Sequence, residues 1–510
     1  MTDARPVQLT GNDLTVADLH AVVFARRPCR LAARARRAVE RSRRTVEKFI
    51  ARDVPLYGVT TGFGELARVK IPRHQLRALQ VNLLRSHAAG VGEPLSEAET
   101  RATLLLRANV LAKGYSGVRP AVIDFLCELL NRGVHPVIPA RGSVGASGDL
   151  APLSHLGLVL IGEGEALVAG KRLPGAKALA QVSLKPLRLE AKEGLSLING
   201  TQPSLAVGLL ALLEAENLAD TADVAASLSL DALRGTPVAF DPRIHDLRPF
   251  PGQKKSARNL ARLNRGSAIR ESHRAPERDP RVQDAYSLRC APQVHGAVRD
   301  ALSYARRSLE IELNSATDNP LVFAPANEVL SGGNFHGQPV ALVLDVVGVA
   351  LAQLGSIAER RVERLVNPAL SGLPAFLTRK PGLNSGFMMA QVTAAALVSE
   401  TKGLAHPASV DSIPTSGQED FVPMSMGAAL KARQIADHVK TILAVELLCA
   451  CQGIDLLAPL RTGRLAERAY RAVRSVSPPL DADRPLTPDI EAVRQLISAR
   501  AFQKLLSRKT

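Results

Sequence analysis

Residues 142–150 read Gly-Ser-Val-Gly-Ala-Ser-Gly-Asp-Leu, between a Pro/Arg turn at 139–141 and an apolar run. Glycine is used where backbone passes close to another group or adopts angles closed to other residues. Three glycines, an alanine and two serines in nine positions therefore predict a compact, unusual backbone. The plainer alternative is a flexible loop, or a helix N-terminus capped by Ser147 or Asp149.

The familiar glycine-rich signatures do not match this stretch. A phosphate-binding loop ends in Gly-Lys-Ser/Thr, but Asp149 follows Gly148. The dinucleotide fingerprint requires a Gly-x-Gly, which is absent here. A hydrolase elbow requires glycine two residues on either side of its serine, and Asp149 occupies one of those places for Ser147. Another chemistry has to be considered.

Composition favours a large helical protein. The chain has 510 residues, of which 46% are hydrophobic and 3% aromatic, and tryptophan is absent. Its core must therefore consist of Leu, Val, Ile and Ala, which suits closely packed helices better than aromatic-rich strands. The length predicts two or three domains or one large helical assembly.

The formal net charge is +17, yet the basic residues are scattered and lack a nucleic-acid recognition motif. We expect no nucleic-acid partner, and interpret the densest basic segment, 254–281, as a solvated loop or helix face. Five cysteines without Cys-x-x-Cys spacing indicate reduced thiols in a cytoplasmic protein, with no zinc site. The most apolar stretch, 341–358, contains Asp345 and Gln353 and fits a buried helix better than a membrane span.

Hydrophobic periodicity predicts a mainly α protein, an elongated bundle of long helices with few short strands. The expected helices are 31–53, 75–84, 97–112, 120–131, 204–233, 303–313, 337–366, 386–403 and 427–455; short strands are expected within 151–192. Loops are expected at 57–64 and 193–202, and the last 50 or so residues should be weakly helical. We divide the chain into 1–203, a loop-rich N-terminal region, and 204–510, the bundle. Such apolar helices would expose large faces in a monomer, so an oligomer is expected.

Several polar loops carry groups that catalysis can use. They contain Tyr57, His87, Asn199, residues 283–289, residues 334–336 and residues 418–420. Tyrosine and glutamate can act as general bases, and an arginine can bind a substrate carboxylate through two hydrogen bonds. Each loop alone could be a helix cap or a turn, but the set is hard to explain by capping alone.

Residues 142–155, Gly-Ser-Val-Gly-Ala-Ser-Gly-Asp-Leu-Ala-Pro-Leu-Ser-His, resemble the signature of the histidine/phenylalanine ammonia-lyase family. The similarity extends from the Tyr57 loop to the 410s. It implies an aspartase/fumarase-like helical fold and a self-made prosthetic group, 4-methylidene-imidazol-5-one (MIO), with no metal or added cofactor. In the family the amide nitrogen at Gly148 attacks the carbonyl carbon of Ala146, and Ser147 loses its hydroxyl as water. A sharply bent backbone without bulky side chains suits that reaction.

The resemblance also implies roles for individual residues. Tyr57 matches the catalytic base and Arg289 the residue that holds the substrate carboxylate. Asn199 and Tyr286 match residues that position the prosthetic group and the amine. Gln283 and Phe335 match further residues of the site.

His87 and Glu419 match the histidine-specific branch of the family. A carboxylate suits an imidazole, because it accepts an N–H or pairs with imidazolium. Beside a phenyl ring it would be desolvated without a partner. The implied reaction is elimination of ammonia from L-histidine to give trans-urocanate, the first step of histidine degradation.

Three alternatives stay open. Residues 416–426 depart from the family pattern, with Phe421 where histidine is usual and Pro423-Met424 as extra residues, so tyrosine ammonia-lyase or aminomutase activity remains possible. From another class come a non-catalytic helical scaffold and a basic nucleic-acid-binding protein, against which the Ala-Ser-Gly tripeptide with Tyr57 and Arg289 argues. The resemblance further implies a homotetramer with shared active sites, in the cytoplasm and without membrane contact.

Overall fold

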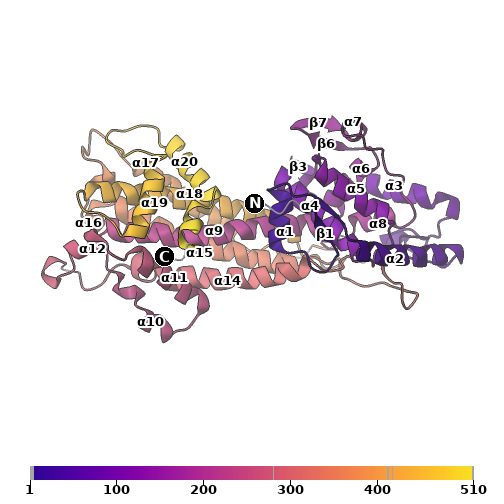
Figure 1. Ribbon diagram of the computed structural model, residues 1–510, viewed down its shortest axis with the longest axis horizontal. Helices are drawn as coiled ribbons and strands as arrows, with labels where there is room; N and C mark the ends of the chain where they lie inside the picture. The colour runs from indigo at the N-terminus through magenta and orange to yellow at the C-terminus, as the bar shows by residue number, and fades with distance from the viewer. Residues whose placement is uncertain (1–4, 280, 411–412, 416, 418, 508–510) are drawn as a thin grey trace. The chain divides into compact units, whose positions relative to one another are not determined.

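The computed structural model describes residues 5–279, 281–410, 413–415, 417 and 419–507. It is mainly helical with short strands, which confirms the predicted fold class (Figure 1). The chain forms two compact units: residues 1–210, 306–344 and 408–430, and residues 211–305, 345–407 and 431–510. Four of the five unit boundaries fall inside the long helices α9 (Gln202–Ala232), α14 (Ala291–Glu312), α15 (Gln338–Val366) and α18 (Ser425–Leu456), and the fifth lies between residues 407 and 408, before α18. The first unit thus includes 306–344 and 408–430, which the expected division at 203 assigns to the bundle, because the chain returns to it through these helices.

Short helices and small sheets build the first unit. Its helices are α1 (Val16–Val23), α2 (Ala33–Ala51), α3 (Leu76–His87), α4 (Glu97–Ala112), α5 (Pro120–Asn131), α6 (Leu150–Leu160), α7 (Gly175–Gln181) and α8 (Glu193–Ile198). Helix α4 lies in the core and begins where predicted, because Ser96 and Glu99 form a capping box in which each side chain bonds the other's backbone N–H.

The sheets of the first unit are small, and some of them pair segments that are distant in the sequence. Strands β1 (Val7–Leu9) and β2 (Cys29–Leu31) are parallel, and β3 (Val91–Pro94) pairs antiparallel with β5 (Pro139–Arg141). Strand β6 (Glu165–Val168) lies between β4 (Val134–Pro136) and β7 (Lys171–Pro174), with Val134 opposite Val168. Strands β8 (Leu321–Phe323) and β9 (Glu328–Leu330) form a hairpin. The strands expected within 151–192 are therefore present as β6 and β7.

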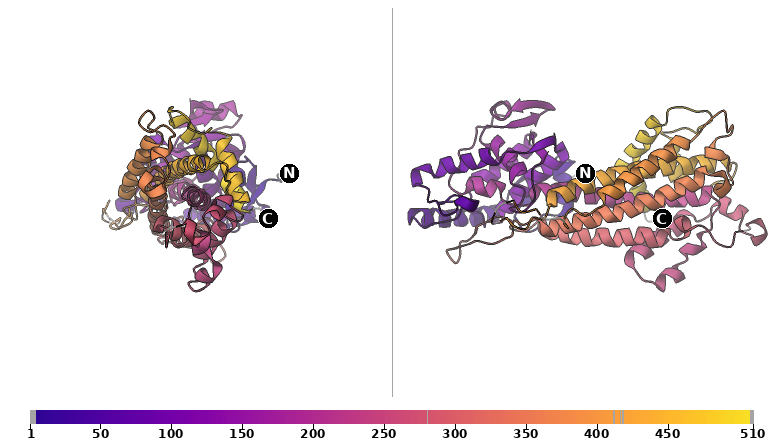
Figure 2. Two further views of the ribbon diagram at one scale, coloured as in Figure 1. Left: turned by 90° about the vertical axis from the view of Figure 1, so that its left-hand side faces the viewer. Right: turned by 180° about the vertical axis from the view of Figure 1, so that it is seen from behind.

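The second unit is a helical bundle. Its parts of α9, α14, α15 and α18 run side by side (Figures 1 and 2). A Cβ added to Gly348 would lie 3.2 Å from the Ile435 side chain, and one on Gly355 3.2 Å from Ile442. These glycines stand seven residues apart and let α15 approach α18 closely. Further helices are α10 (Pro242–Asp246), α11 (Pro251–Leu263), α12 (Ala268–Ser272), α13 (Tyr286–Arg289), α16 (Pro368–Ser371), α17 (Met388–Leu404), α19 (Arg464–Arg474), α20 (Thr487–Ser498) and α21 (Ala501–Ser507).

Several local predictions were wrong. Residues 193–198 form helix α8 rather than a loop, and α19, α20 and α21 occupy much of the range 464–507, which was expected to be weakly helical. The helix expected from 303 begins at Ala291. The apolar stretch 341–358 lies in α15, which by length and composition alone could cross a membrane. Because 61% of its most apolar window is buried inside the protein, it is the buried helix that was expected.

A fully buried ionic network ties the bundle together. Arg361 donates to both carboxylate oxygens of Glu446 at 2.6 and 2.9 Å. Nearby, His295 bonds one oxygen of Asp223 at 2.8 Å and Arg299 donates to the other at 2.6 Å. Burial raises the pKa of Asp223, but the charge of Arg299 and the bond to His295 outweigh it and lower this pKa to about 2.

Replacement of Glu446 by leucine should lower the free energy of unfolding by about 3–5 kcal/mol, because Arg361 would stay buried without its counter-charge. Urea unfolding of parent and variant measures the difference. The matched control is Asp437→Asn, because Asp437 pairs with Arg494 while 57% of its side chain is exposed. That change should cost no more than about 1 kcal/mol. Equal effects of the two substitutions would contradict the expectation.

Candidate active site

A cavity of 890 Å³ in the first unit gathers seven of the predicted residues. Segments far apart in the sequence line it: the loop after α2, the end of α3, the start of α6, the end of α8, and residues from 319–336 and 419–421. The predicted residues in its wall are Tyr57, His87, Ala146, Ser147, Asn199, Phe335 and Glu419. These seven residues, proposed from separate loops, therefore meet at one place.

The tripeptide 146–148 lies in a sharply bent backbone. Isolated bridges join Gly148 to Gly145 and to Ala146, and Gly148 has a φ of +75°. A Cβ at this position would lie 2.3 Å from the carbonyl oxygen of Gly200. Since that contact is with backbone, a side chain could not be accommodated, and glycine is required here.

Three other segments hold this bend from outside. Gly337 N–H donates to the Gly145 carbonyl at 3.0 Å, and Met424 N–H donates to the Val144 carbonyl at 2.8 Å. Asp149 N–H donates to the Gly200 carbonyl at 2.8 Å. The loop thus has its shape imposed by the rest of the unit, which excludes the flexible-loop alternative.

Asp149 begins helix α6 as its N-cap residue, but its side chain makes no capping bond. Instead the fully buried carboxylate accepts from the Ser143 hydroxyl at 2.6 Å and from Ser204 N–H at 2.8 Å. Burial raises the pKa of Asp149, and these two hydrogen bonds partly offset the rise. The carboxylate therefore links the start of the tripeptide loop to the start of α9.

Asn199 contacts the tripeptide directly. Its amide nitrogen donates to the Ser147 carbonyl at 2.9 Å. Its amide oxygen, Oδ1, is buried and has no hydrogen-bond partner within the described part of the chain. A buried acceptor left unsatisfied is costly, so this oxygen is suited to receive a donor from a bound ligand.

Arg107 of α4, which the sequence analysis missed, fixes the peptide of Asn199. Its fully buried guanidinium donates to the Asn199 carbonyl at 3.0 Å, to Gln202 at 2.6 Å, and to the Ser196 carbonyl. Burial lowers the pKa of Arg107 to about 10. The sequence could have indicated this role, because Arg107 lies inside the apolar run 104–111, and a charged residue there has to be buried with hydrogen-bond partners.

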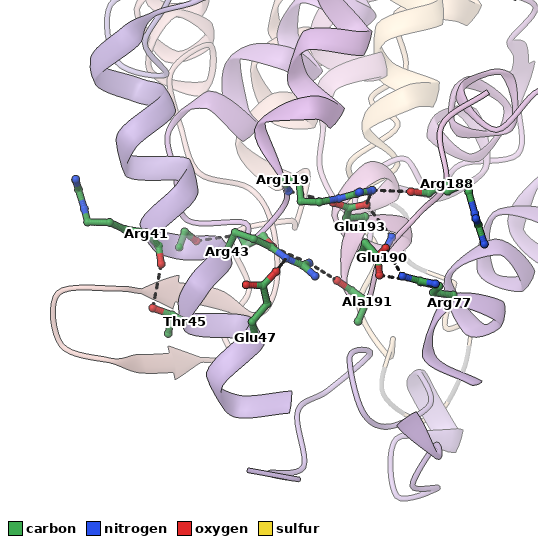
Figure 3. A network of polar contacts seen from close by, with 12 residues as sticks. Arg41, Arg43, Thr45, Glu47, Arg77, Arg119, Arg188, Glu190, Ala191 and Glu193 are labelled. Atoms are coloured by element: carbon green, nitrogen blue, oxygen red, sulfur yellow. Dashed lines mark hydrogen bonds and ion pairs between the residues drawn. The ribbon is translucent and has the colours of Figure 1, made fainter. Parts of the chain in front are cut away.

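Ion pairs hold helix α8 at its other end (Figure 3). Glu193 is fully buried and accepts from Arg119 at 2.7 Å through each of two nitrogens. Three residues earlier, Glu190 accepts from Arg77 of α3 at 2.7 and 2.9 Å, which lowers the pKa of Glu190. Both ends of the helix that carries Asn199 are therefore fixed.

Tyr57 lies in the glycine-rich loop as predicted, and its ring lines the cavity. The ring meets Phe63 edge-on at 6.2 Å, and the hydroxyl accepts from Gly64 N–H at 3.0 Å. The hydroxyls of Thr60 and Thr61 accept from Leu56 N–H and Gly58 N–H, at 2.8 and 3.3 Å. These bonds give the loop a defined form that aims the phenol.

His87 is the last residue of α3, not part of the turn that follows. Its Nδ1 lies 3.0 Å from the Leu83 carbonyl oxygen. The Ser86 hydroxyl, which can donate or accept, lies 2.9 Å from the same Nδ1 atom. Because the Leu83 carbonyl can only accept, a proton on Nδ1 satisfies both contacts, and this tautomer leaves Nε2 as an acceptor. His87 therefore offers a lone pair to a ligand in the cavity.

Glu419 is half-buried in the cavity wall, next to the exposed Phe421. Phe421 stacks on His336 at 5.9 Å, and the His336 ring bonds the Phe421 carbonyl at 3.2 Å. The neighbours Ser416 and Gln418 lie outside the described residues.

Gln283, Tyr286 and Arg289 belong to the second unit and are not among the residues that line this cavity. The Arg289 guanidinium lies 4.5 Å from the Tyr286 ring centre and donates to the Asp284 carbonyl at 3.0 Å. Gln283 is exposed, and Tyr286 is 71% exposed. Within this chain Gln283 and Tyr286 are therefore exposed, whereas Arg289 is half-buried.

Comparison with known proteins identifies the family. The sequence model described as aromatic amino acid lyase matches residues 14–475. The chain belongs to the aromatic amino acid lyase family. This confirms the resemblance inferred from residues 142–155.

Individual members of the aromatic amino acid lyase family match over nearly their whole length. Histidine ammonia-lyase of Koribacter versatilis is 59% identical over 97% of this chain and 98% of that protein. Histidine ammonia-lyase of Myxococcus xanthus is 55% identical over 97% of both. Among solved structures, histidine ammonia-lyase from Trypanosoma cruzi superposes with a TM-score of 0.91 at 44% identity, covering 98% of this chain and 95% of that one. Tyrosine aminomutase from Streptomyces globisporus superposes with a TM-score of 0.94 at 41% identity, covering 99% of both.

The residues around the tripeptide fit a prosthetic group made by a lyase of this family from its own backbone. Position 148 admits no side chain, and an isolated backbone bridge brings Ala146 and Gly148 together. The buried Asn199 Oδ1 has no donor within the described residues. In the part of the chain that the structure describes, no group of three or more His, Cys, Asp or Glu side chains is placed to hold a metal ion.

Proposed function

We propose that this chain eliminates ammonia from L-histidine to give trans-urocanate. The observation that carries the proposal is that His87 and Glu419 line the same cavity as Ser147 and Tyr57. Two acceptors, the Nε2 atom of His87 and the Glu419 carboxylate, suit an imidazolium ring, because both of its nitrogens donate. The relatives that are 55–59% identical and bear the name histidine ammonia-lyase support this choice.

The electrophile would come from Ala146, Ser147 and Gly148. A methylidene-imidazolone formed there would supply an electrophilic carbon for the substrate amine. Asn199 would keep its hydrogen bond to the Ser147 carbonyl, 2.9 Å long here, and so hold that carbonyl in one orientation. The Oδ1 atom of Asn199 would accept an N–H of the substrate amine.

Tyr57 would remove the proton from the β-carbon. That hydrogen is barely acidic, so its removal needs a base held close to it and aimed at it. The bond from Gly64 N–H and the edge-on contact with Phe63 provide that orientation.

Recognition of the substrate ring would fall to His87 and Glu419. With its proton on Nδ1, bonded to Leu83, His87 would accept a ring N–H of the substrate through Nε2. Glu419 would accept from the second ring nitrogen of the imidazolium form and pair with its charge, which favours an imidazole over a phenyl ring.

The substrate carboxylate would bind Arg289 of another copy of the chain, with Tyr286 and Gln283 beside it. The 71% exposure of Tyr286 and the apolar faces left by the helices support a homo-oligomer, which we propose to be a tetramer. Helix α17 exposes 63% of Met389 and 46% of Val392.

We also propose that the protein works in the cytoplasm. The five free cysteines agree with a reducing compartment.

Incubation with L-histidine, L-tyrosine and L-phenylalanine tests the assignment, with the unsaturated acid followed by its absorbance. We expect turnover of histidine to exceed that of the other two. Glu419→Gln should lower kcat/KM for histidine by about 10²-fold, the scale lost with one charged hydrogen bond to substrate, about 2–3 kcal/mol. The control Glu328→Gln changes a carboxylate of β9 that does not line the cavity, and should have no effect. Preferred turnover of tyrosine, or formation of a β-amino acid, would overturn the assignment.

A further inference from the structure

Gln80 occupies a position between the segments that carry Tyr57, His87 and Asn199. It lies on α3, two turns before His87, and its side chain is fully buried. Its amide oxygen accepts from Leu195 N–H of α8 at 3.1 Å. Its amide nitrogen donates to the Gly58 carbonyl, next to Tyr57, at 3.3 Å. One amide thus satisfies a buried donor and a buried acceptor from two different segments.

The three segments are packed without spare room at this point. A Cβ on Gly194 would lie 2.5 Å from the Gln80 carbonyl oxygen, so α8 touches the backbone of α3. A Cβ on Gly58 would lie 2.6 Å from the Leu195 side chain and 2.5 Å from the Phe63 ring. Gly58 also has a φ of +63°, which favours glycine. Small residues therefore bring the Tyr57 loop, α3 and α8 into contact around Gln80.

Ion pairs make α3 and α8 a firm support for this contact. Arg77 lies one turn before Gln80 on the same helix and is bonded to Glu190, just before α8 (Figure 3). Glu193, in the first turn of α8, is held by Arg119. The Gln80 amide extends this link from the two helices to the loop, through the carbonyl group adjacent to Tyr57.

We propose that Gln80 is a positioning residue that fixes the Tyr57 hydroxyl relative to Asn199 and the tripeptide. It acts through the Gly58 carbonyl and touches no substrate, since it is fully buried and does not line the cavity. The inference rests on the proposed elimination reaction and deepens it. When the bond to Gly58 is lost, Tyr57 moves relative to the β-carbon, and proton removal slows while the binding groups on α3 and α8 stay in place.

Gln80→Met tests the proposal, because methionine has a similar length and neither donates nor accepts strongly. We expect kcat for L-histidine to fall about tenfold to a hundredfold, the scale that follows a misplacement of about 1 Å, with KM within about threefold of the parent value. The kinetic isotope effect with β-deuterated L-histidine should rise, because proton removal becomes slower than the other steps. Intact mass should still show the loss of two waters that marks the completed tripeptide ring.

Two further variants keep the test decisive. Gln80→Glu retains an oxygen for Leu195 N–H and replaces the amide nitrogen that faces the Gly58 carbonyl by an oxygen. It should show the same loss of kcat, and it serves as the test where the methionine variant fails to fold.

The matched control is Gln452→Met, because Gln452 is 2% exposed and also bridges backbone groups, donating to the Leu377 and Leu480 carbonyls at 3.2 and 3.0 Å. It should unfold more easily while keeping its kcat and isotope effect.

Unchanged kcat in both Gln80 variants would overturn the proposal, as would an equal rise of the isotope effect in Gln452→Met. Absence of the ring from the Gln80 variants would also overturn it, because the residue would then act on ring formation. A parent protein inactive on L-histidine would instead refute the proposed function, so the two failures are distinguishable.

Discussion

Ser147→Ala protein is expected to fold like the parent and to lose its elimination activity by about 10³-fold or more, the scale seen when a group that reacts covalently is removed. Its intact mass should not show the loss of the side-chain water, whereas the parent should be lighter by two waters, one from ring closure at the Ala146 carbonyl and one from the Ser147 side chain. The reason is local: without the Ser147 hydroxyl no water can leave from the side chain. Mass spectrometry, near-ultraviolet absorbance and circular dichroism measure ring formation and folding separately.

Ser154→Ala is the matched control for this experiment. Ser154 lies on α6, just after the tripeptide, and its buried hydroxyl has no hydrogen-bond partner within the described residues. The substitution removes the same atom from the same neighbourhood, so mass loss and activity should persist. Full activity of Ser147→Ala would refute the role of the tripeptide.

Tyr57→Phe should lower kcat by about 10²–10⁴-fold, the usual contribution of a general base. KM should change little, because the ring and its contact with Phe63 remain. The loss of two waters should persist, because the Tyr57 hydroxyl is not one of the groups that close the ring. The unchanged mass loss separates the effect of Tyr57→Phe on kcat from that of Ser147→Ala. Steady-state kinetics together with intact mass provide the measurement.

Tyr115→Phe controls for loss of a phenolic hydroxyl elsewhere in the first unit. Tyr115 packs against Phe323 at 5.5 Å and does not line the cavity. Its substitution should leave kcat unchanged. If the two variants behaved alike, Tyr57 would not be the base.

Long apolar periodicity and motif chemistry were sufficient to predict much of this protein. Helices α4 and α5 occur at the predicted bounds, because the capping box at Ser96 and the proline at 120 mark their starts. The tripeptide, Tyr57, His87 and Asn199 were found because they match motifs of the ammonia-lyase family, although each loop alone could have been a cap or a turn. Each lies in the cavity wall or beside it.

What could not be predicted depends on tertiary contacts. Residues 193–198 contain Gly194 and precede Asn-Gly, which is typical of a loop, yet they form α8. Gly194 is tolerated there because a side chain would collide with Gln80, so packing outweighs helix propensity. Arg107 and Gln80 carry no motif, and their partners lie 92 and 115 residues away in the sequence. Only the folded chain shows what they hold.

The bend at Gly148 bears on when the tripeptide can react during synthesis and folding. Its shape depends on Gly200, Gly337 and Met424, so the backbone that forces Gly148 toward Ala146 is complete only after most of the chain has been synthesised and has folded. A nascent chain ending before residue 424 would carry the tripeptide but would lack part of the clamp around it. Under the proposed chemistry, the ring would therefore form only in correctly folded copies, and a misfolded copy would lack the electrophile.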